Sequence, residues 1–231
     1  MKAKESGDFK RDLPEAGTTV ARCVKVLQLG TQEKTFKGEK KTQQVVRLVW
    51  ELPFLMHQFK PDADEEPFRV SKEYNFSIHE KADFRKDIEK WANRELTNQE
   101  KQDGFDPKVL LGKTCQLTIA HEKGNDGNIY ARVKAISPLL KEQKNSKGVV
   151  LQPAQVCPPA ISEFIHFDFD ESSTFKNWSK LFKNEKEKIR RSPEFSAIAN
   201  QLEPPQNDAQ RGNQQAQHVP HSEDIEDDLP F

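Results

Sequence analysis

Histidine and carboxylate side chains that could support catalysis occur at three places in the chain. They are His166, Asp168 and Asp170 in FIHFDFD, and the pairs His79-Glu80 and His121-Glu122. Such groups can bind a metal ion that cleaves phosphodiesters. The alternation of apolar and polar residues in FIHFDFD is also typical of a β-strand whose apolar residues face the protein and whose polar residues face water. Because H-E-x-x-H, Walker and G-x-S-x-G motifs are absent, we expect no enzyme, no metal and no cofactor.

The cysteines Cys23, Cys115 and Cys157 form no C-x-x-C pair and have no histidines at zinc spacing. This argues against a disulfide framework or a structural zinc and favours a reducing, cytoplasmic setting. The charged start of the chain and the absence of a long apolar run predict a protein without a membrane partner.

Charge is distributed unevenly along the 231 residues, whose formal net charge is −1. Residues 201–231 hold seven acids against Arg211 alone, which leaves residues 1–200 at about +5. A basic body with an acidic end is typical of a protein that binds a polyanion.

The first part of the chain reads as three strands. TTVARCVKVL (18–27) and QVVRLVWEL (44–52) are β-branched and alternating, and Pro53 ends the second. Gly38 lies between them in a lysine-rich segment, which predicts a long hairpin with a basic tip. A third strand follows at 68–78. On the second strand, alternation places Trp50 in the core.

A helical insertion comes next. Phe84, Ile88 and Trp91 recur at helical spacing within residues 79–94, on the face that should close the bottom of a barrel. A short helical piece at 106–111 precedes TCQLTIAHE and NIYARVKAI, which read as a hairpin. In an OB-fold, three strands are followed by a helical insertion and then by two more strands. We therefore expect a mainly β protein built on a five-stranded OB-fold barrel at residues 17–138.

The rest of the chain reads as appendages. We expect an N-terminal arm at 1–16, a linker at 139–160, a helical extension at 161–200 and a disordered acidic tail at 201–231. Within the extension, FIHFDFD favours a short strand, residues 174–191 an amphipathic helix, and Pro193 the start of another short helix.

The end of the sequence carries the most specific motif. Asp227, Asp228, Leu229, Pro230 and Phe231 combine acids with an apolar end, which can enter a small apolar pocket with a basic rim. This D-D-x-P-F pattern after a Gln/Asn-rich tail resembles the tip of bacterial single-stranded DNA-binding proteins. The resemblance implies that the tip recruits replication, recombination and repair proteins, although Leu229 stands where that family commonly has isoleucine.

Three stretches of the folded part resemble small bacteriophage replication-region proteins to which single-stranded DNA binding is ascribed. They are VARCVKVLQLGTQ, VSKEYNFSIHEKADFRKDIEKW and LLGKTCQLTIAHE. The two resemblances together imply a bacteriophage single-stranded DNA-binding protein with an OB-fold.

Binding single strands without sequence choice needs cations for phosphates and aromatic faces for bases. Phe36 is an aromatic candidate because it lies in the lysine-rich tip, and Tyr74 and Phe76 are candidates because barrel strands curl at their ends. The complete candidate set is Arg22, Lys25, Lys34, Phe36, Lys37, Lys40, Lys41, Arg47, Arg69, Lys72, Tyr74, Phe76, Arg132 and Lys134.

Two alternatives to single-stranded DNA binding remain from the residues. The chain could be a replication-associated adaptor, or an RNA-binding OB protein without strong DNA binding. The sequence leaves the oligomeric state open, including a homo-oligomer, and also the role of residues 139–200.

Overall fold

A computed structural model describes residues 12–36 and 38–203, without the side chains of Thr35 and Phe36. The expected tip at 227–231 and most of the expected tail and N-terminal arm lie outside these residues. The sheet strands are β1 (Gly17–Phe36), β2 (Glu39–His57), β3 (Glu66–Asn75), β4 (Thr114–Lys123) and β5 (Ile129–Ser137). They form an antiparallel sheet in the order β3-β2-β1-β4-β5, which confirms the mainly β class and the predicted order of strands.

The long strand β1 organises this sheet. It pairs with β4 from Gly17 to Arg22 and with β2 from Arg22 to Phe36. Both hairpin strands are longer than predicted, because the polar residues near the tip continue the backbone ladder without needing a core. β2 also continues past Pro53, where the register with β3 shifts, and such irregular positions accommodate proline.

Two hydrophobic cores lie on opposite faces of the sheet. The first contains Val46, Leu48 and Trp50, and Trp50 is fully buried, as its alternation predicts. Phe84 and Ile88 of α1 (Asp83–Ala92) pack into the same core. The second core is formed by residues of β1, β2 and the C-terminal extension: Leu27, Leu29, Val45, Ile165, Phe167, Trp178, Leu181, Ile189 and Ile198.

The helical insertion contains more than was predicted. After α1 comes α2 (Asn98–Asp103), begun by a capping box in which Thr97 accepts from the Glu100 amide and Glu100 accepts from the Thr97 amide. The short helix at 106–111 is a 3₁₀ turn, η1 (Pro107–Leu110), with the proline at its start.

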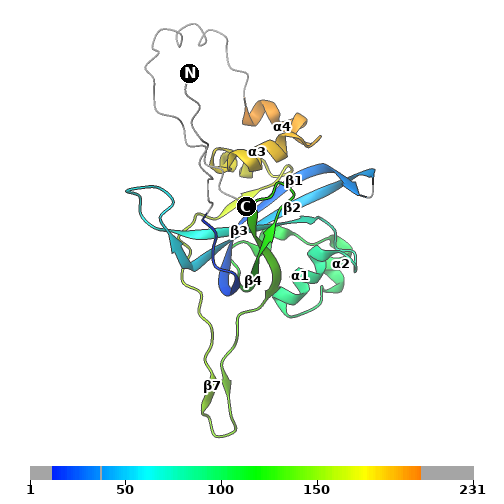
Figure 1. Ribbon diagram of the computed structural model, residues 1–231. Helices are drawn as coiled ribbons and strands as arrows, with labels where there is room; N and C mark the ends of the chain where they lie inside the picture. The colour runs from blue at the N-terminus through cyan, green and yellow to red at the C-terminus, as the bar shows by residue number, and fades with distance from the viewer. Residues whose placement is uncertain (1–11, 37, 204–231) are drawn as a thin grey trace.

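The C-terminal extension lies against the sheet on the side away from α1 and α2 (Figure 1). Its strand β8 (Ile165–Phe167) pairs parallel to β1 at Lys25–Leu27, which confirms the strand predicted in FIHFDFD. The helix predicted at 174–191 is wrong as one element, because η2 (Ser172–Lys180) and α3 (Lys183–Arg190) are separated where Leu181 adopts an extended conformation and enters the second core. The short helix expected after Pro193 is α4 (Phe195–Leu202).

The segment expected to be a linker contains a small hairpin instead. Strands β6 (Gln143–Lys144) and β7 (Val150–Gln152) pair antiparallel around a turn at Asn145–Gly148. This arm projects away from the rest of the protein (Figure 1). Val149, Val150 and Leu151 are exposed on it.

Candidate nucleic-acid interface

Lys25, one of the predicted phosphate contacts, lies inside the protein. It is only 3% exposed, its Nζ is 3.1 Å from Oε2 of Glu185, and the same Nζ lies 3.7 Å from the centre of the Phe182 ring. Burial lowers the pKa of Lys25, and Glu185 opposes that shift. Lys25 therefore joins β1 to α3 and is not available to a phosphate.

Arg47 is held in a similar way between the sheet and the extension. It is 3% exposed, and its NH2 atom is 2.5 Å from Oε1 of Glu73 on β3. Lys188 of α3 donates to the same carboxylate oxygen. Burial by itself would raise the pKa of Glu73, but Arg47 and Lys188 outweigh it and leave the pKa lowered. We remove Arg47 from the candidate set for the same reason as Lys25.

Arg22 holds loop segments together. Its guanidinium donates to the carbonyl oxygens of Gly112 at 2.9 Å, Cys157 at 3.2 Å and Pro158 at 2.7 Å. These bonds attach the returning end of the 139–160 segment to β1. Because these three carbonyl oxygens hold the Arg22 guanidinium, it is not available to a DNA phosphate.

Tyr74 belongs to the core and not to a stacking surface. It is 3% exposed, and its hydroxyl donates to Oδ2 of Asp87 on α1 at 3.0 Å. Burial raises the pKa of Tyr74 well above its ordinary value, and Asp87 adds to this. Lys72 donates to the same carboxylate oxygen at 2.7 Å. Asp87 on α1 therefore joins the helix to Lys72 and Tyr74 on β3.

The remaining candidates in this region are Arg69 on β3 and Phe76, which directly follows β3. The Phe76 ring is half-buried and meets the Phe84 ring edge-on at 5.4 Å between ring centres. Arg69 pairs with Glu66 at 3.0 Å and lies 5.5 Å from the centre of the Phe182 ring. Both side chains are less open to solvent than the exposed lysines of the β1–β2 hairpin.

The cations of the β1–β2 hairpin are placed differently, because they are exposed. Lys40 lies 2.9 Å from Glu33, and Lys41 lies 3.4 Å from Glu39, with at least half of each lysine side chain open to solvent. Exposed pairs of this kind contribute only ~0–1 kcal/mol, so a phosphate can replace the acid. The candidates Phe36 and Lys37 lie here in the sequence, but their side chains are outside the described residues.

A groove of about 490 Å³ lies where the hairpin meets the end of β3. It brings together two predicted cations, Lys34 and Lys72, and Lys34 donates to the Asn75 side chain at 3.0 Å. Two residues that we did not predict as contacts, His79 and Lys81, also line it. Their position directly after the third predicted strand is the signal that could have identified them, because loops leaving strand ends carry many binding residues.

The acids at this groove are fewer than its cations. The complete lining is Lys34, Gln43, Lys72, Glu73, Tyr74, Asn75, Ser77, His79, Lys81, Ala82 and Asp83. Lys81 is exposed and has no ion-pair partner among the described residues. The groove therefore has a slight excess of positive charge next to the lysine-bearing hairpin.

The β4–β5 hairpin presents a separate cationic surface. Arg132 is exposed and lies 5.1 Å from the centre of the Tyr130 ring, and Lys134 pairs with Glu122. Tyr130 also donates a hydrogen bond to Asp126. Our sequence reasoning missed Tyr130, although an aromatic two residues before an arginine on one strand face is a recognisable stacking pattern.

The histidine and carboxylates of FIHFDFD are spread apart by the fold. We expected His166 to face water, but it is 6% exposed, because β8 lies between β1 and the helices of the extension. Asp168 accepts from Gln28 and from the Asp170 amide. Within residues 12–36 and 38–203, no three histidine, cysteine or acidic side chains are grouped as a metal site would require.

Neither a family model nor a curated protein matches the chain. In the part of the chain that the structure describes, every helix is too short or too polar to cross a membrane. A functional proposal therefore rests on the surfaces described above and on the sequence motifs.

Proposed function

We propose that this protein binds single-stranded DNA with little base preference, on the outer part of the β1–β2 hairpin and the adjoining groove at the end of β3. The observation that carries this proposal is that Lys34 and Lys81 line one groove beside the exposed Lys40 and Lys41, whereas Lys72, in the same groove, is paired with Asp87. Lysines in a row along a ribbon and a groove can follow a phosphate backbone without reading bases.

The fold supports this choice of ligand. The strand order, the helix between β3 and β4 and the doubly paired β1 support the proposal of an OB-fold, which commonly binds oligonucleotides. The end strands β3 and β5 contact each other, and α1 packs on both. We propose that these two strands close the sheet into a barrel, with the hairpin and groove at its open side.

Base stacking in this proposal falls to Phe36, which lies in the lysine-rich tip by sequence. A stacked base contributes ~1–3 kcal/mol irrespective of its identity, which suits binding without sequence preference.

The acidic end of the chain has a separate role in the proposal. Residues 227–231 recruit proteins of DNA replication, recombination or repair, as their resemblance to the tip of bacterial single-stranded DNA-binding proteins implies. Deleting residues 223–231 is expected to leave DNA affinity unchanged or to raise it, because negative charge is removed. A severe fall in DNA affinity would contradict this role.

The test is a fluorescence-anisotropy titration of labelled oligo-dT of about 30 nucleotides, beside the matched duplex and an RNA of the same length. The single strand should bind tightly and the duplex weakly. Lys34→Glu with Lys81→Glu should weaken binding about tenfold or more, because phosphate contacts dominate affinity.

The matched control reverses two exposed lysines that do not line the groove, Lys147 on the arm and Lys176 on η2. Lys147→Glu with Lys176→Glu makes the same change in net charge and should alter affinity less than about twofold. Equal loss in both variants would show a net-charge effect without a site. Preference for RNA over DNA would replace the proposed ligand, and absent binding would remove it.

A further inference from the structure

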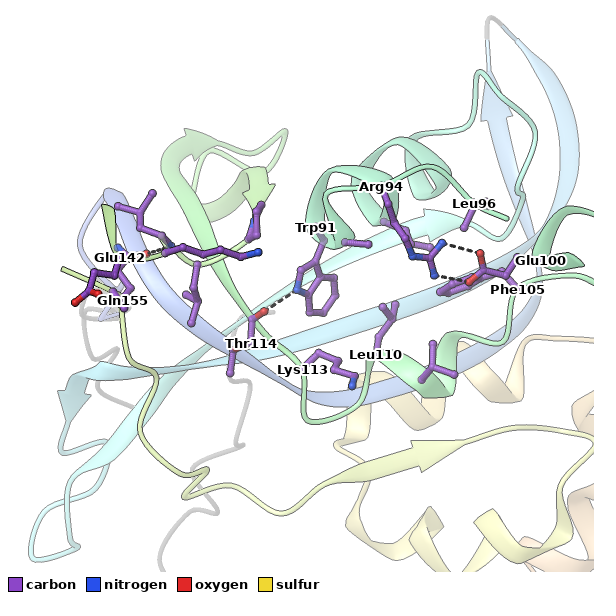
Figure 2. Close-up of a pocket in the computed structure, with 18 residues that line it drawn as sticks. Trp91, Arg94, Leu96, Glu100, Phe105, Leu110, Lys113, Thr114, Glu142 and Gln155 are labelled. Carbon is purple, nitrogen blue, oxygen red and sulfur yellow. Dashed lines mark hydrogen bonds and ion pairs between the residues drawn. The ribbon is translucent and has the colours of Figure 1, made fainter. Parts of the chain in front are cut away.

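A second groove, of about 830 Å³, lies at the helical end of the protein. Figure 2 shows Trp91, Leu96, Phe105 and Leu110 gathered around it, with Trp91 donating from Nε1 to the Thr114 carbonyl oxygen at 2.7 Å. That bond fixes the indole ring in the floor. The groove shares no lining residue with the one at the end of β3, so it is a separate surface.

Apolar residues at the border of this groove are open to solvent. Val109 of η1 is 53% exposed, and Leu140, which follows β5, is 42% exposed. Together with the floor they form an apolar groove, and exposed apolar grooves of this kind are typical of peptide-binding sites.

The uncompensated charge around the groove is positive. Arg94 is paired with Glu100 at 2.7 Å, and Glu142 is paired with Lys144 at 2.7 Å. The other two charged lining residues, Lys113 and Lys141, are exposed and have no ion-pair partner among the described residues. A ligand that fits this groove has apolar side chains and negative charge.

We propose that this groove binds the acidic C-terminal segment of the same chain, residues 223–231. The segment contains five acids and the apolar residues Ile225, Leu229, Pro230 and Phe231. The apolar side chains match the floor, and the acids match the two free lysines.

The length of chain between the last described residue and this segment is sufficient. Nineteen residues separate Glu203 from Glu223. At ~3.3 Å per residue they span up to ~60 Å, which exceeds the ~40 Å diameter expected for a globular body of about 190 residues. The segment can therefore reach the groove of its own chain.

Docking in this groove has a consequence for partner recruitment. A tip held by its own chain is withheld from other proteins, so the groove sets how readily a partner captures the tip. Because the groove is apart from the proposed DNA surface, DNA need not displace the segment. The inference therefore stands or falls independently of DNA binding.

The test uses a fluorescent peptide of residues 221–231 and the full chain carrying Leu229→Ser and Phe231→Ser, whose own segment competes less. We expect saturable binding of the peptide. Adding Lys113→Glu and Lys141→Glu should weaken it about tenfold, because two exposed attractions become repulsions. Adding Val109→Asp and Leu140→Asp instead should weaken it similarly, and both positions are exposed enough to leave the fold intact.

Two controls make the result decisive. Lys147→Glu with Lys176→Glu, which lie outside the groove, should leave peptide affinity within about twofold. A scrambled peptide of the same composition should bind at least about tenfold more weakly, because its apolar residues no longer match the floor. The proposal would be overturned if both peptides bound equally, if the groove substitutions left peptide affinity unchanged, or if the peptide showed no saturable binding.

A titration of the same variants with oligo-dT separates this inference from the proposed function. The Lys113→Glu and Lys141→Glu variant should keep the DNA affinity of the unsubstituted chain. Loss of DNA binding but not of peptide binding in the Lys34→Glu and Lys81→Glu variant would complete the separation. If the groove variants lose DNA affinity as well, the groove is part of the DNA surface and the inference is wrong.

Discussion

Nζ of Lys25 on β1 lies 3.1 Å from Oε2 of Glu185 on α3, and both side chains are buried. The two residues are 160 positions apart in the chain, so this ion pair joins the first strand to the C-terminal extension. With β8 paired to β1 at the same place, the extension covers a face of the sheet that an OB-fold can use for ligands. In the function proposed above, nucleic acid binds beyond the edge of that cover, at the hairpin and the β3 groove.

Replacing Glu185 alone should destabilise the protein strongly. Glu185→Leu leaves the Lys25 ammonium buried without its acid, which costs about 3–5 kcal/mol. The double variant Lys25→Met with Glu185→Leu should recover most of this loss, because no charge remains buried. Urea unfolding followed by circular dichroism measures both effects.

The exposed pair Lys40–Glu33 provides the control for this experiment. Glu33→Gln should cost about 1 kcal/mol or less, because exposed ion pairs contribute little. Similar losses for Glu33→Gln and Glu185→Leu would contradict the buried position of the ion pair.

Gly30 is a second point at which the extension constrains the sheet. Its φ is +70°, and a Cβ atom there would lie 2.5 Å from Cβ of Ser192. Gly30→Ala should therefore cost about 2–5 kcal/mol, from backbone strain and overpacking together. Gly38 has φ +84°, and a Cβ atom there would have nothing within 4 Å, so Gly38→Ala measures the cost of backbone strain without overpacking. This substitution should cost only about 1 kcal/mol. Equal losses would show that Ser192 does not pack against β1.

The elements that could be predicted from the sequence are those encoded locally. Alternation placed Val46, Leu48 and Trp50 in the core, and helical spacing placed Phe84 and Ile88 against it. The same alternation could not show what lies on the other face of the sheet. Whether a strand cation meets water, phosphate or a carboxylate depends on residues distant in the chain.

Arg47 and Lys34 illustrate this limit for the candidate site. Both are cations on or next to predicted strands, but Arg47 faces Glu73 beneath the extension, whereas Lys34 lies beyond its edge. The break after η2 was also hidden, because Leu181 keeps the helical spacing of apolar residues while its backbone is extended. In both places, packing between segments distant in the chain determines the structure.

Salt dependence should distinguish the exposed lysines from the buried ones. For single-stranded DNA, log Kd changes with log salt by ~0.7 for each phosphate contact, so Lys34→Gln or Lys81→Gln should each lower the slope by about that amount. The Lys25→Met and Glu185→Leu double variant should keep the original slope. Anisotropy titrations at four salt concentrations between ~50 and ~200 mM measure the slopes. A reduced slope in the double variant would return Lys25 to the DNA surface.

His166 should make stability depend on pH. Its two ring nitrogens have no hydrogen-bond partner among the described residues, and burial lowers its pKa, which the nearby Glu171 opposes. Lys108 also lowers the pKa, and Asp168 and Asp106 raise it, by smaller amounts. The net shift means that the unfolded chain binds a proton more readily than the folded one.

The sign of the stability change follows from that difference. Above the ordinary histidine pKa of about 6.5 neither state is protonated at this residue, and the folded state keeps its full stability. As pH falls below that value, the unfolded state gains protons first, so stability decreases until the lowered pKa of the folded state is reached. His166→Leu removes the titrating group and should reduce the loss in urea midpoint between pH 7.5 and pH 5.5. His79→Gln, at an exposed position, should leave that loss unchanged. If His166→Leu and His79→Gln behave alike, the buried position of His166 between β1 and the extension does not govern the response to acid.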